Sequence, residues 1–138
     1  MILANTNVFA ELTKPDPDRR VVRWYARHRR DIALCAVVAF EVMAGVEALR
    51  DRARRKRVGA AYSSLFGDLD RPSLVLDDQA ARLAAVLQGD ARRGGVQMKA
   101  QDALIAGIAK RHRVELATRN TKDFRATGLT LIDPWNAP

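Results

Sequence analysis

Two acidic residues of this sequence lie in otherwise uncharged, largely apolar stretches, where an isolated charge suggests a specific role. Glu41 is the only charged residue between Ile32 and Val46, and Asp102 is the only one between Ala100 and Ala109. An unpaired carboxylate on an apolar helix face is costly. A buried arginine could pair with Glu41, and Asp102 alone could simply stabilise the N-terminus of its helix. The recurrence of the pattern favours a shared acidic site instead.

A third acidic residue, Asp123, follows a short apolar stretch in a polar segment that also carries Asn120. Taken singly, such a segment is typical of a turn or a helix cap. Carboxylates gathered at one site repel one another unless a divalent cation neutralises them, and oxygen ligands suit Mg²⁺ or Mn²⁺. The chain has one cysteine, Cys35, which we expect to be buried, and two histidines. These residues do not form a spaced set of zinc ligands.

The charge balance predicts a polyanionic partner. The chain carries 24 Lys and Arg against 16 Asp and Glu, a net charge of +8, which favours association with nucleic acid. Because cations held by acids polarise a scissile phosphate and activate water, the expected reaction is phosphodiester hydrolysis. Arg54, Arg55 and Arg57 are candidate RNA contacts, although a basic run is about as often a solvated helix face. No P-loop, GxSxG or GxGxxG motif supports another chemistry.

Apolar strand-like stretches alternate with helical ones along the 138 residues, a length that fits one domain, 1–138. This order predicts an α/β fold with a mostly parallel sheet covered by helices. Ligands bind beyond the carboxyl ends of such strands, so Asn5, Thr6 and Asn7 are candidates as well. The expected strands are 1–4, 32–35, 73–76, 115–118 and 129–132; the expected helices begin at 5–7, at Asp16 with Pro17 in the first helical position, and cover 37–49, 54–66, 77–93 and 100–112.

Four segments together resemble PIN-domain ribonucleases of the VapC type, the toxins of bacterial toxin–antitoxin modules. The opening MILANTNV resembles the family's apolar strand followed by aspartate, threonine and asparagine. Glu41 falls where the family has a helix-borne glutamate, and Gln101-Asp102-Ala103 resembles its third acidic position. The segment 118–124, TRNTKDF, resembles its C-terminal motif closely. The resemblance spans the whole chain.

The resemblance implies an α/β/α sandwich and a Mg²⁺- or Mn²⁺-dependent endoribonuclease that cleaves structured RNA such as tRNA. It also implies a homodimer and inhibition by a cognate antitoxin. Lys99 replaces a usual helix-capping serine and could touch the substrate. Carried over by position, the metal site would comprise Asn5, Glu41, Asp102 and Asp123, with Thr6, Asn7, Thr118 and Asn120 lining it.

Asn5 departs from the family pattern, which has aspartate at this position. The amide keeps a carbonyl oxygen but loses one negative charge and cannot accept a proton, so metal affinity and water activation should both fall. Asn5 is either an introduced inactivating substitution or the residue of a naturally weakened relative. The intact remaining acids favour the first interpretation.

Two other functions compete with the nuclease. One is a non-catalytic nucleic-acid-binding module, and the other is an interaction protein whose acidic groove holds a basic side chain of an antitoxin. The first predicts binding without a metal, and the second predicts co-purification of a small partner. The apolar stretches are too short for a membrane span and no targeting segment is recognisable, so we expect a cytoplasmic protein.

Overall fold

The computed structural model describes residues 1–138 and contains one four-stranded, all-parallel sheet. Its strand order is β2-β1-β3-β4. The strands are β1 (Ile2–Ala4), β2 (Ile32–Ala33), β3 (Glu115–Ala117) and β4 (Leu131–Ile132). β1 and β3 are almost completely buried, which is why they read as apolar runs rather than alternating patterns. The α/β fold class with a parallel sheet is therefore confirmed.

The strand register places the two ends of the chain side by side. β1 occupies an inner position, where Leu3 pairs with Ala33 of β2 on one edge and with Leu116 of β3 on the other. Ala4 pairs with Ala117, and the backbone N–H of Asn5 donates to the carbonyl of Ala117 at 2.9 Å. The carboxyl ends of β1 and β3 therefore meet at one edge of the sheet, although more than 100 residues separate them.

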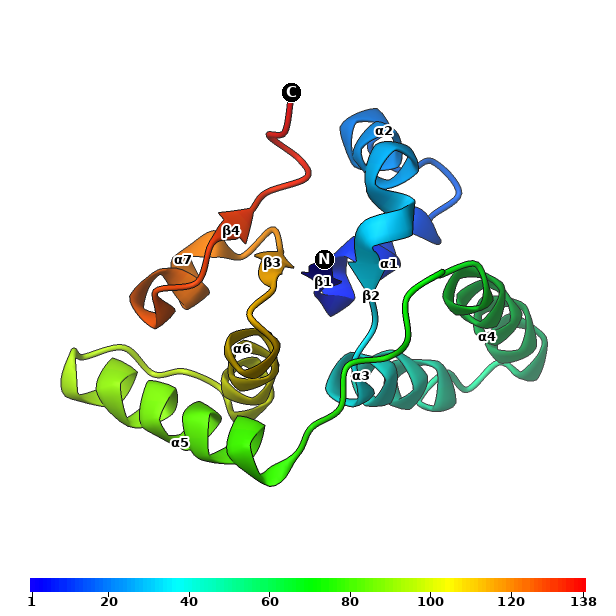
Figure 1. The fold of residues 1–138 in the computed structure, drawn as a ribbon. Coiled ribbons are helices and arrows are strands. Elements are labelled where there is room, and N and C mark those ends of the chain that lie inside the picture. Colours follow the sequence, from blue (N-terminus) through cyan, green and yellow to red (C-terminus); the bar gives the residue numbers. More distant parts are fainter.

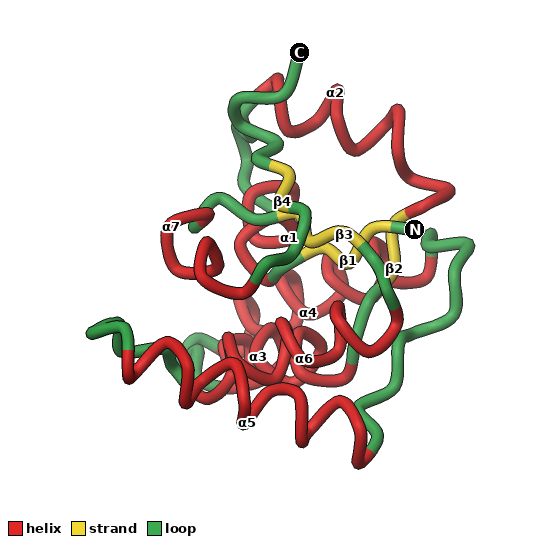
Figure 2. Tube along the Cα trace, turned by 60° about the vertical axis from the view of Figure 1, so that its left-hand side comes forward, coloured by secondary structure: helices red, strands yellow, loops and turns green.

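Helices cover both faces of this small sheet. Figure 2 shows α3, α5 and α6 on one side of the strands and α2 on the other, and Figure 1 shows the same separation. None of the helices combines the length and apolar character needed to cross a membrane. The helices are α1 (Thr6–Leu12), α2 (Arg19–His28), α3 (Ala36–Glu47), α4 (Arg52–Gly67), α5 (Asp78–Arg93), α6 (Ala100–His112) and α7 (Thr121–Phe124), with short 3-10 turns at Arg29–Asp31 and Arg125–Thr127.

A single apolar cluster joins the sheet to its helices. Phe9 of α1 packs edge-on against Phe66 of α4, with ring centroids 5.2 Å apart. Helices α5 and α6 share the most extensive helix contact, and a Cβ added at Gly107 would lie 2.8 Å from the Cβ and backbone nitrogen of Ala84 and still nearer to the carbonyl oxygen of Ala80. Glycine at position 107 thus permits a backbone approach that no other residue allows. Cys35 is buried, as expected, and burial raises the pKa of its thiol.

The strand predicted at 73–76 is wrong. Only Leu74 is buried there, and it forms an isolated bridge to Cys35, while Val75 is exposed and Leu76 is at least one-third exposed. With only one buried side chain and one bridge, the segment does not form a strand, and it leads to α5 as a loop. β2 is likewise shorter than expected, since Cys35 already serves as the N-cap of α3.

Two helix starts also differ from the prediction. α2 begins at Arg19, not at Pro17, because the carboxylate of Asp18 accepts the backbone N–H of Arg20 at 2.8 Å and caps the helix. α4 begins at Arg52, two residues before its predicted start at residue 54. Asp51 caps this helix by accepting the backbone N–H of Arg54 at 3.1 Å. Neither shift moves an acidic candidate out of its element.

Candidate active site

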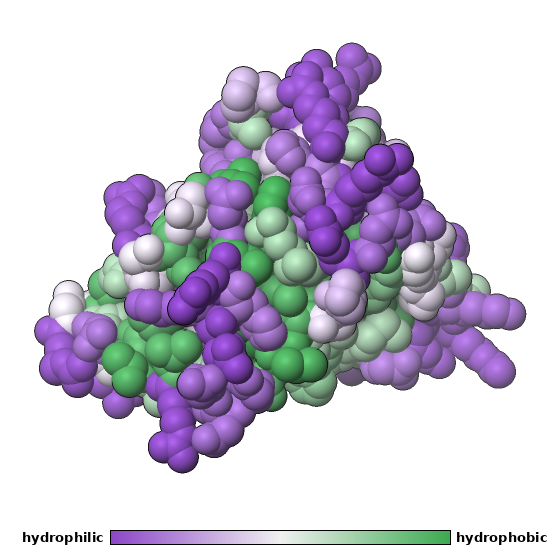
Figure 3. Space-filling view, in the orientation of Figure 1, coloured by the Kyte–Doolittle hydropathy of each residue, from purple (hydrophilic) through white to green (hydrophobic).

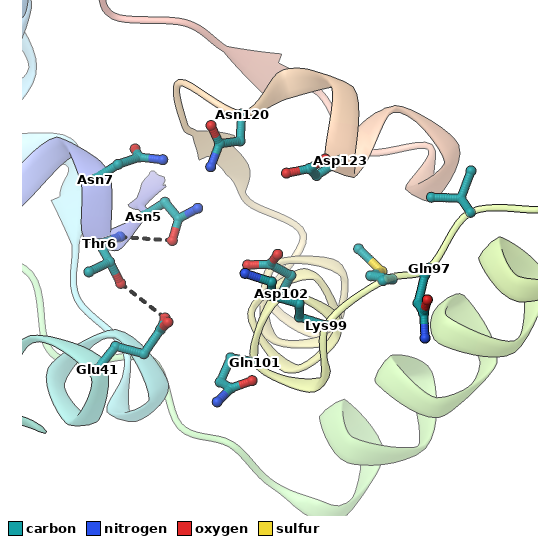
Figure 4. A pocket seen from close by; sticks show the side chains of 12 residues that line it. Asn5, Thr6, Asn7, Glu41, Gln97, Lys99, Gln101, Asp102, Asn120 and Asp123 are labelled. Atoms are coloured by element: carbon teal, nitrogen blue, oxygen red, sulfur yellow. Dashed lines mark hydrogen bonds between the residues drawn. The ribbon is translucent and has the colours of Figure 1, made fainter.

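The acidic candidates lie around one pocket of about 480 Å³ at the carboxyl edge of β1 and β3. Figure 4 shows it between the end of β1, the N-terminus of α6 and the turn at α7, with the carboxylates of Asp102 and Asp123 directed toward its centre. The lining is strongly polar. Its residues are Asn5, Thr6, Asn7, Glu41, Val96, Gln97, Met98, Lys99, Gln101, Asp102, Asn120 and Asp123.

Asn5 joins β1 to α1 and is held from both sides. Its Oδ1 accepts the backbone N–H of Thr6 at 2.7 Å, which makes Asn5 the N-cap of α1. Its Nδ2 donates to Oγ1 of Thr118 at 3.1 Å. Thr6 in turn directs its hydroxyl to Oε1 of Glu41 at 3.0 Å, which connects α1 to α3 and orients that carboxylate (Figure 4). The first turn of α1 therefore fixes two of the candidate side chains.

Thr118 lies beneath the pocket, is fully buried and does not line the pocket itself. Its hydroxyl oxygen accepts Nδ2 of Asn7 at 3.2 Å and the backbone N–H of Asn120 at 3.1 Å, in addition to Asn5. Oδ1 of Asn7 accepts the backbone N–H of Arg119 at 3.3 Å. These bonds tie the end of β3 to the start of α1, so the asparagines at 5 and 7 act in part as structural links.

The acids in the pocket have no positive partner. None of the ion pairs in the structure involves Glu41, Asp102 or Asp123. Burial raises the pKa of Asp102, and the nearby charges of Glu41 and Asp123 raise it further, while Lys99 lowers it. The pocket therefore holds three carboxylates that form no ion pair, and Lys99 only partly offsets their negative charge.

This donor set fits a hard divalent cation by its chemistry. It offers carboxylate, amide and hydroxyl oxygens, which Mg²⁺ and Mn²⁺ prefer, and a bound cation would relieve the repulsion that Asp102 experiences. No three Asp, Glu, His or Cys side chains approach closely enough to form a complete metal-holding group. Asn5 also lines the pocket, where its amide supplies an oxygen but no negative charge.

We expect the Asp102→Asn variant to be more stable than the unsubstituted chain in metal-free buffer at neutral pH. Because the pKa of Asp102 is raised, the folded protein binds the proton of this carboxyl group more tightly than the unfolded chain does. The ionised carboxylate therefore destabilises the fold at pH values above its ordinary pKa of 3.8. The free energy of unfolding should rise by ~0.5–1 kcal/mol, because Asp102 is only half-buried. Urea denaturation at neutral pH measures the gain.

The same pair of proteins should become equally stable as the pH falls below 3.8. Asp70→Asn is the matched control, since Asp70 is exposed and makes no ion pair. A loss of stability in Asp102→Asn at neutral pH, or a gain no larger than in the control, would show that repulsion in the pocket is unimportant.

The structure brings most of the sequence-predicted site residues together. The pocket brings together Asn5, Thr6, Asn7, Glu41, Lys99, Asp102, Asn120 and Asp123, and Thr118 supports them from below. Sequence reasoning missed the segment 96–98 and Gln101 as lining residues. The Gly94-Gly95 break ahead of α6 was a usable signal, because a chain that leaves α5 and enters α6 at the pocket must line it.

The candidate RNA contacts lie elsewhere. Arg54, Arg55 and Arg57 belong to α4 and do not line the pocket. Arg54 and Arg57 are exposed, whereas Arg55 is partly buried and donates to the carbonyl of Leu49 at 2.9 Å. Figure 3 shows hydrophilic side chains projecting on the side of the molecule where α4 lies.

Comparisons with known proteins agree on one family. A model of the PIN domain family matches residues 2–129. The chain is 31% identical over 141 residues to Toxin FitB of Neisseria gonorrhoeae, covering 99% of both proteins. It is 34% identical over 141 residues to VapC ribonuclease Y4jK of Sinorhizobium fredii, covering 98% of both. The crystal structure of FitAcB from Neisseria gonorrhoeae superposes with a TM-score of 0.85 at 31% identity, over 99% of this chain and 100% of that one.

Proposed function

The chain belongs to the PIN domain family, and on that premise we propose that it is the toxin of a type II toxin–antitoxin module. Its activity would be metal-dependent endonucleolytic cleavage of structured RNA such as tRNA. One observation carries the proposal: three carboxylates from α3, α6 and α7, none of them in an ion pair, line one pocket at the carboxyl edge of the parallel sheet. Two relatives with full-length matches are named a toxin and a ribonuclease, in line with this function.

Each pocket residue has a role in this proposal. Asp102 and Asp123, with the oxygen of residue 5 and Glu41, would hold Mg²⁺ or Mn²⁺. The cation would neutralise charge on the scissile phosphate and lower the pKa of the attacking water. Glu41, oriented by the hydroxyl of Thr6, could accept a proton at its second carboxylate oxygen. Lys99 and Asn120, which also line the pocket, would contact the RNA backbone.

Asn5 would impair this machinery while preserving its shape. The amide still caps α1 through Oδ1, as an aspartate would, so the fold of the site does not require the charge. The missing charge weakens attraction for a divalent cation in a pocket whose other acids are only partly assembled. We therefore propose that the chain with Asn5 binds metal weakly and cleaves slowly.

Cleavage of structured RNA by the Asn5→Asp protein tests the function. Total tRNA and unrelated structured RNAs are incubated with the variant in Mn²⁺ or in chelator, and the products are mapped on denaturing gels. Discrete fragments that require Mn²⁺ are expected. If a panel of RNAs stays intact in Mn²⁺ while the variant remains folded by circular dichroism, the chain is not an endoribonuclease of this kind.

We expect neutralisation of Arg54, Arg55 and Arg57 to weaken RNA binding and to reduce its dependence on salt. For every phosphate that is no longer neutralised, the slope of log affinity against log salt should become shallower by ~0.7. Fluorescence anisotropy over a KCl series, in chelator to prevent cleavage, gives the slope. Neutralising Arg82, Lys110 and Arg113 removes the same charge from the surface between α5 and the end of α6. If the affinity and the salt slope change equally in the two triple variants, α4 contributes only its net charge to RNA binding and makes no specific phosphate contacts.

A non-catalytic role is the second candidate, favoured by the incomplete metal-holding group and by Asn5. In that role the acidic pocket would receive a basic side chain from an antitoxin or a nucleic acid partner. We further propose a cytoplasmic single-domain protein, 1–138, that forms a homodimer and is inhibited by its cognate antitoxin. Co-purification of a small partner with the tagged chain, and light scattering of the chain alone, test the last two points.

A further inference from the structure

The hydroxyl of Thr118 makes an unusual set of hydrogen bonds. Its oxygen faces three donors at once: Nδ2 of Asn5 at 3.1 Å, Nδ2 of Asn7 at 3.2 Å and the N–H of Asn120 at 3.1 Å. A threonine hydroxyl has two lone pairs and one proton to donate. Three donors therefore compete for two lone pairs, while the hydroxyl proton donates to no group in this fully buried position.

The direction of each of these bonds is fixed by the backbone. Oδ1 of Asn5 must face the N–H of Thr6, because turning the amide over would bring two donors together. The same argument fixes Asn7, whose Oδ1 accepts the N–H of Arg119. The third donor is itself a backbone N–H, that of Asn120. Rotating amides therefore cannot relieve the crowding around Thr118.

We propose that Thr118 is a positioning residue for a carboxylate at position 5, and that the surrounding hydrogen bonds are arranged for that carboxylate rather than for the amide of Asn5. With aspartate there, one oxygen accepts the N–H of Thr6 and the other accepts the hydroxyl of Thr118. The hydroxyl oxygen of Thr118 then accepts only two hydrogen bonds, from Nδ2 of Asn7 and from the backbone N–H of Asn120. Two accepted bonds and one donated bond match the capacity of a hydroxyl. The link to metal binding rests on the proposed function.

This arrangement would orient the carboxylate at position 5 and still leave some of its acceptor positions free. An ionised carboxylate accepts about four hydrogen bonds, so two bonds to the protein leave acceptor positions free for a cation. Because Thr118 is buried and tied to two further donors, its hydroxyl cannot turn away from residue 5. Thr118 would act on the metal only through residue 5.

Thr118→Val and Thr118→Ser, each made with Asn5 and with Asn5→Asp, test the metal-binding part. Titration of the purified chain with Mn²⁺ alone should give about tenfold tighter binding for Asn5→Asp than for Asn5. Adding Thr118→Val should remove about tenfold of affinity from the aspartate protein and less than about twofold from the asparagine protein. Thr118→Ser, which keeps the hydroxyl, should restore the affinity to within about twofold. Equal losses on both backgrounds would overturn the positioning role.

A second variant tests the hydrogen-bond pattern without metal and without changing the buried threonine. Asn7→Ala removes one of the three donors at Thr118. With Asn5 this relieves crowding, whereas with Asn5→Asp it breaks a satisfied bond. The folding equilibrium constant from urea denaturation in chelator should therefore fall about fivefold more in the aspartate background. The same change in both backgrounds would contradict the proposal, whatever the metal titrations give.

RNA cleavage distinguishes this inference from the proposed function. If both couplings are present but no RNA is cut, Thr118 still positions residue 5 and the endoribonuclease proposal fails. If Asn5→Asp cuts RNA in Mn²⁺ but Thr118→Val has the same effect on both backgrounds, the function holds and the positioning role is wrong.

Discussion

The Asn5→Asp variant should cleave its RNA on the order of 10²-fold faster in Mn²⁺ than the unsubstituted chain. Residue 5 stands at the carboxyl end of an inner strand, where the backbone bond to Ala117 leaves it little freedom to move. The substitution adds one negative charge with almost no change in shape, so the gain should come from the metal site and not from a change of fold. Initial rates over a Mn²⁺ titration separate tighter binding from faster chemistry.

Two controls make this result specific. Asn7→Asp places the same charge in the same pocket, two residues away, but not at the end of β1. It should gain less than about a tenth of the activity of Asn5→Asp. Adding Asp102→Asn to the Asn5→Asp protein should abolish the gain, since it removes the acid at the N-terminus of α6. If Asn7→Asp activates as strongly, charge in the pocket matters and position 5 does not.

Gly107→Ala should be the most destabilising of the glycine-to-alanine changes in the protein, lowering the free energy of unfolding by about 3 kcal/mol. The added methyl would overlap the carbonyl oxygen of Ala80 and the backbone nitrogen of Ala84, which are main-chain atoms of α5 and cannot rotate aside. The helices must separate, and α6 carries Asp102. Urea denaturation in chelator measures the loss, and Mn²⁺ affinity of the Asn5→Asp protein should fall with it.

Gly45→Ala provides the matched control in another helix. Gly45 lies in α3 on an exposed face, and no atom lies within 4 Å of the position of an added Cβ. Alanine is the better helix former there, so we expect a gain of ~0.5–1 kcal/mol. A loss in both variants would point to a general intolerance of side chains in these helices and not to the contact between α5 and α6.

Local sequence patterns predicted the acidic pocket better than they predicted the elements around it. Glu41 and Asp102 were recognisable because each breaks an apolar run, and a parallel sheet brings strand ends to one edge. The strand prediction at 73–76 failed because four apolar or small residues suit a strand equally well whether one or two faces are buried. Burial there depends on partners that a local pattern does not contain.

Contacts between distant segments were beyond the sequence patterns. The resemblance suggested that Thr118 belongs to the site, but its three donors come from segments at both ends of the chain, and only the fold shows that they meet at one oxygen. Gly107 is one of several glycines in helices, and nothing nearby in the sequence marks it as the close contact with α5. Such features depend on tertiary geometry and not on local preference.

The pairing of β1 with β3 sets the order of events during synthesis. β1 leaves the ribosome first, but its partner strand and the carbonyl of Ala117, which holds Asn5, are made more than 100 residues later. A growing chain therefore contains the first pocket residues long before it can assemble the pocket. Any activity that depends on this pocket can therefore begin only after β3 and the residues up to Asp123 have left the ribosome.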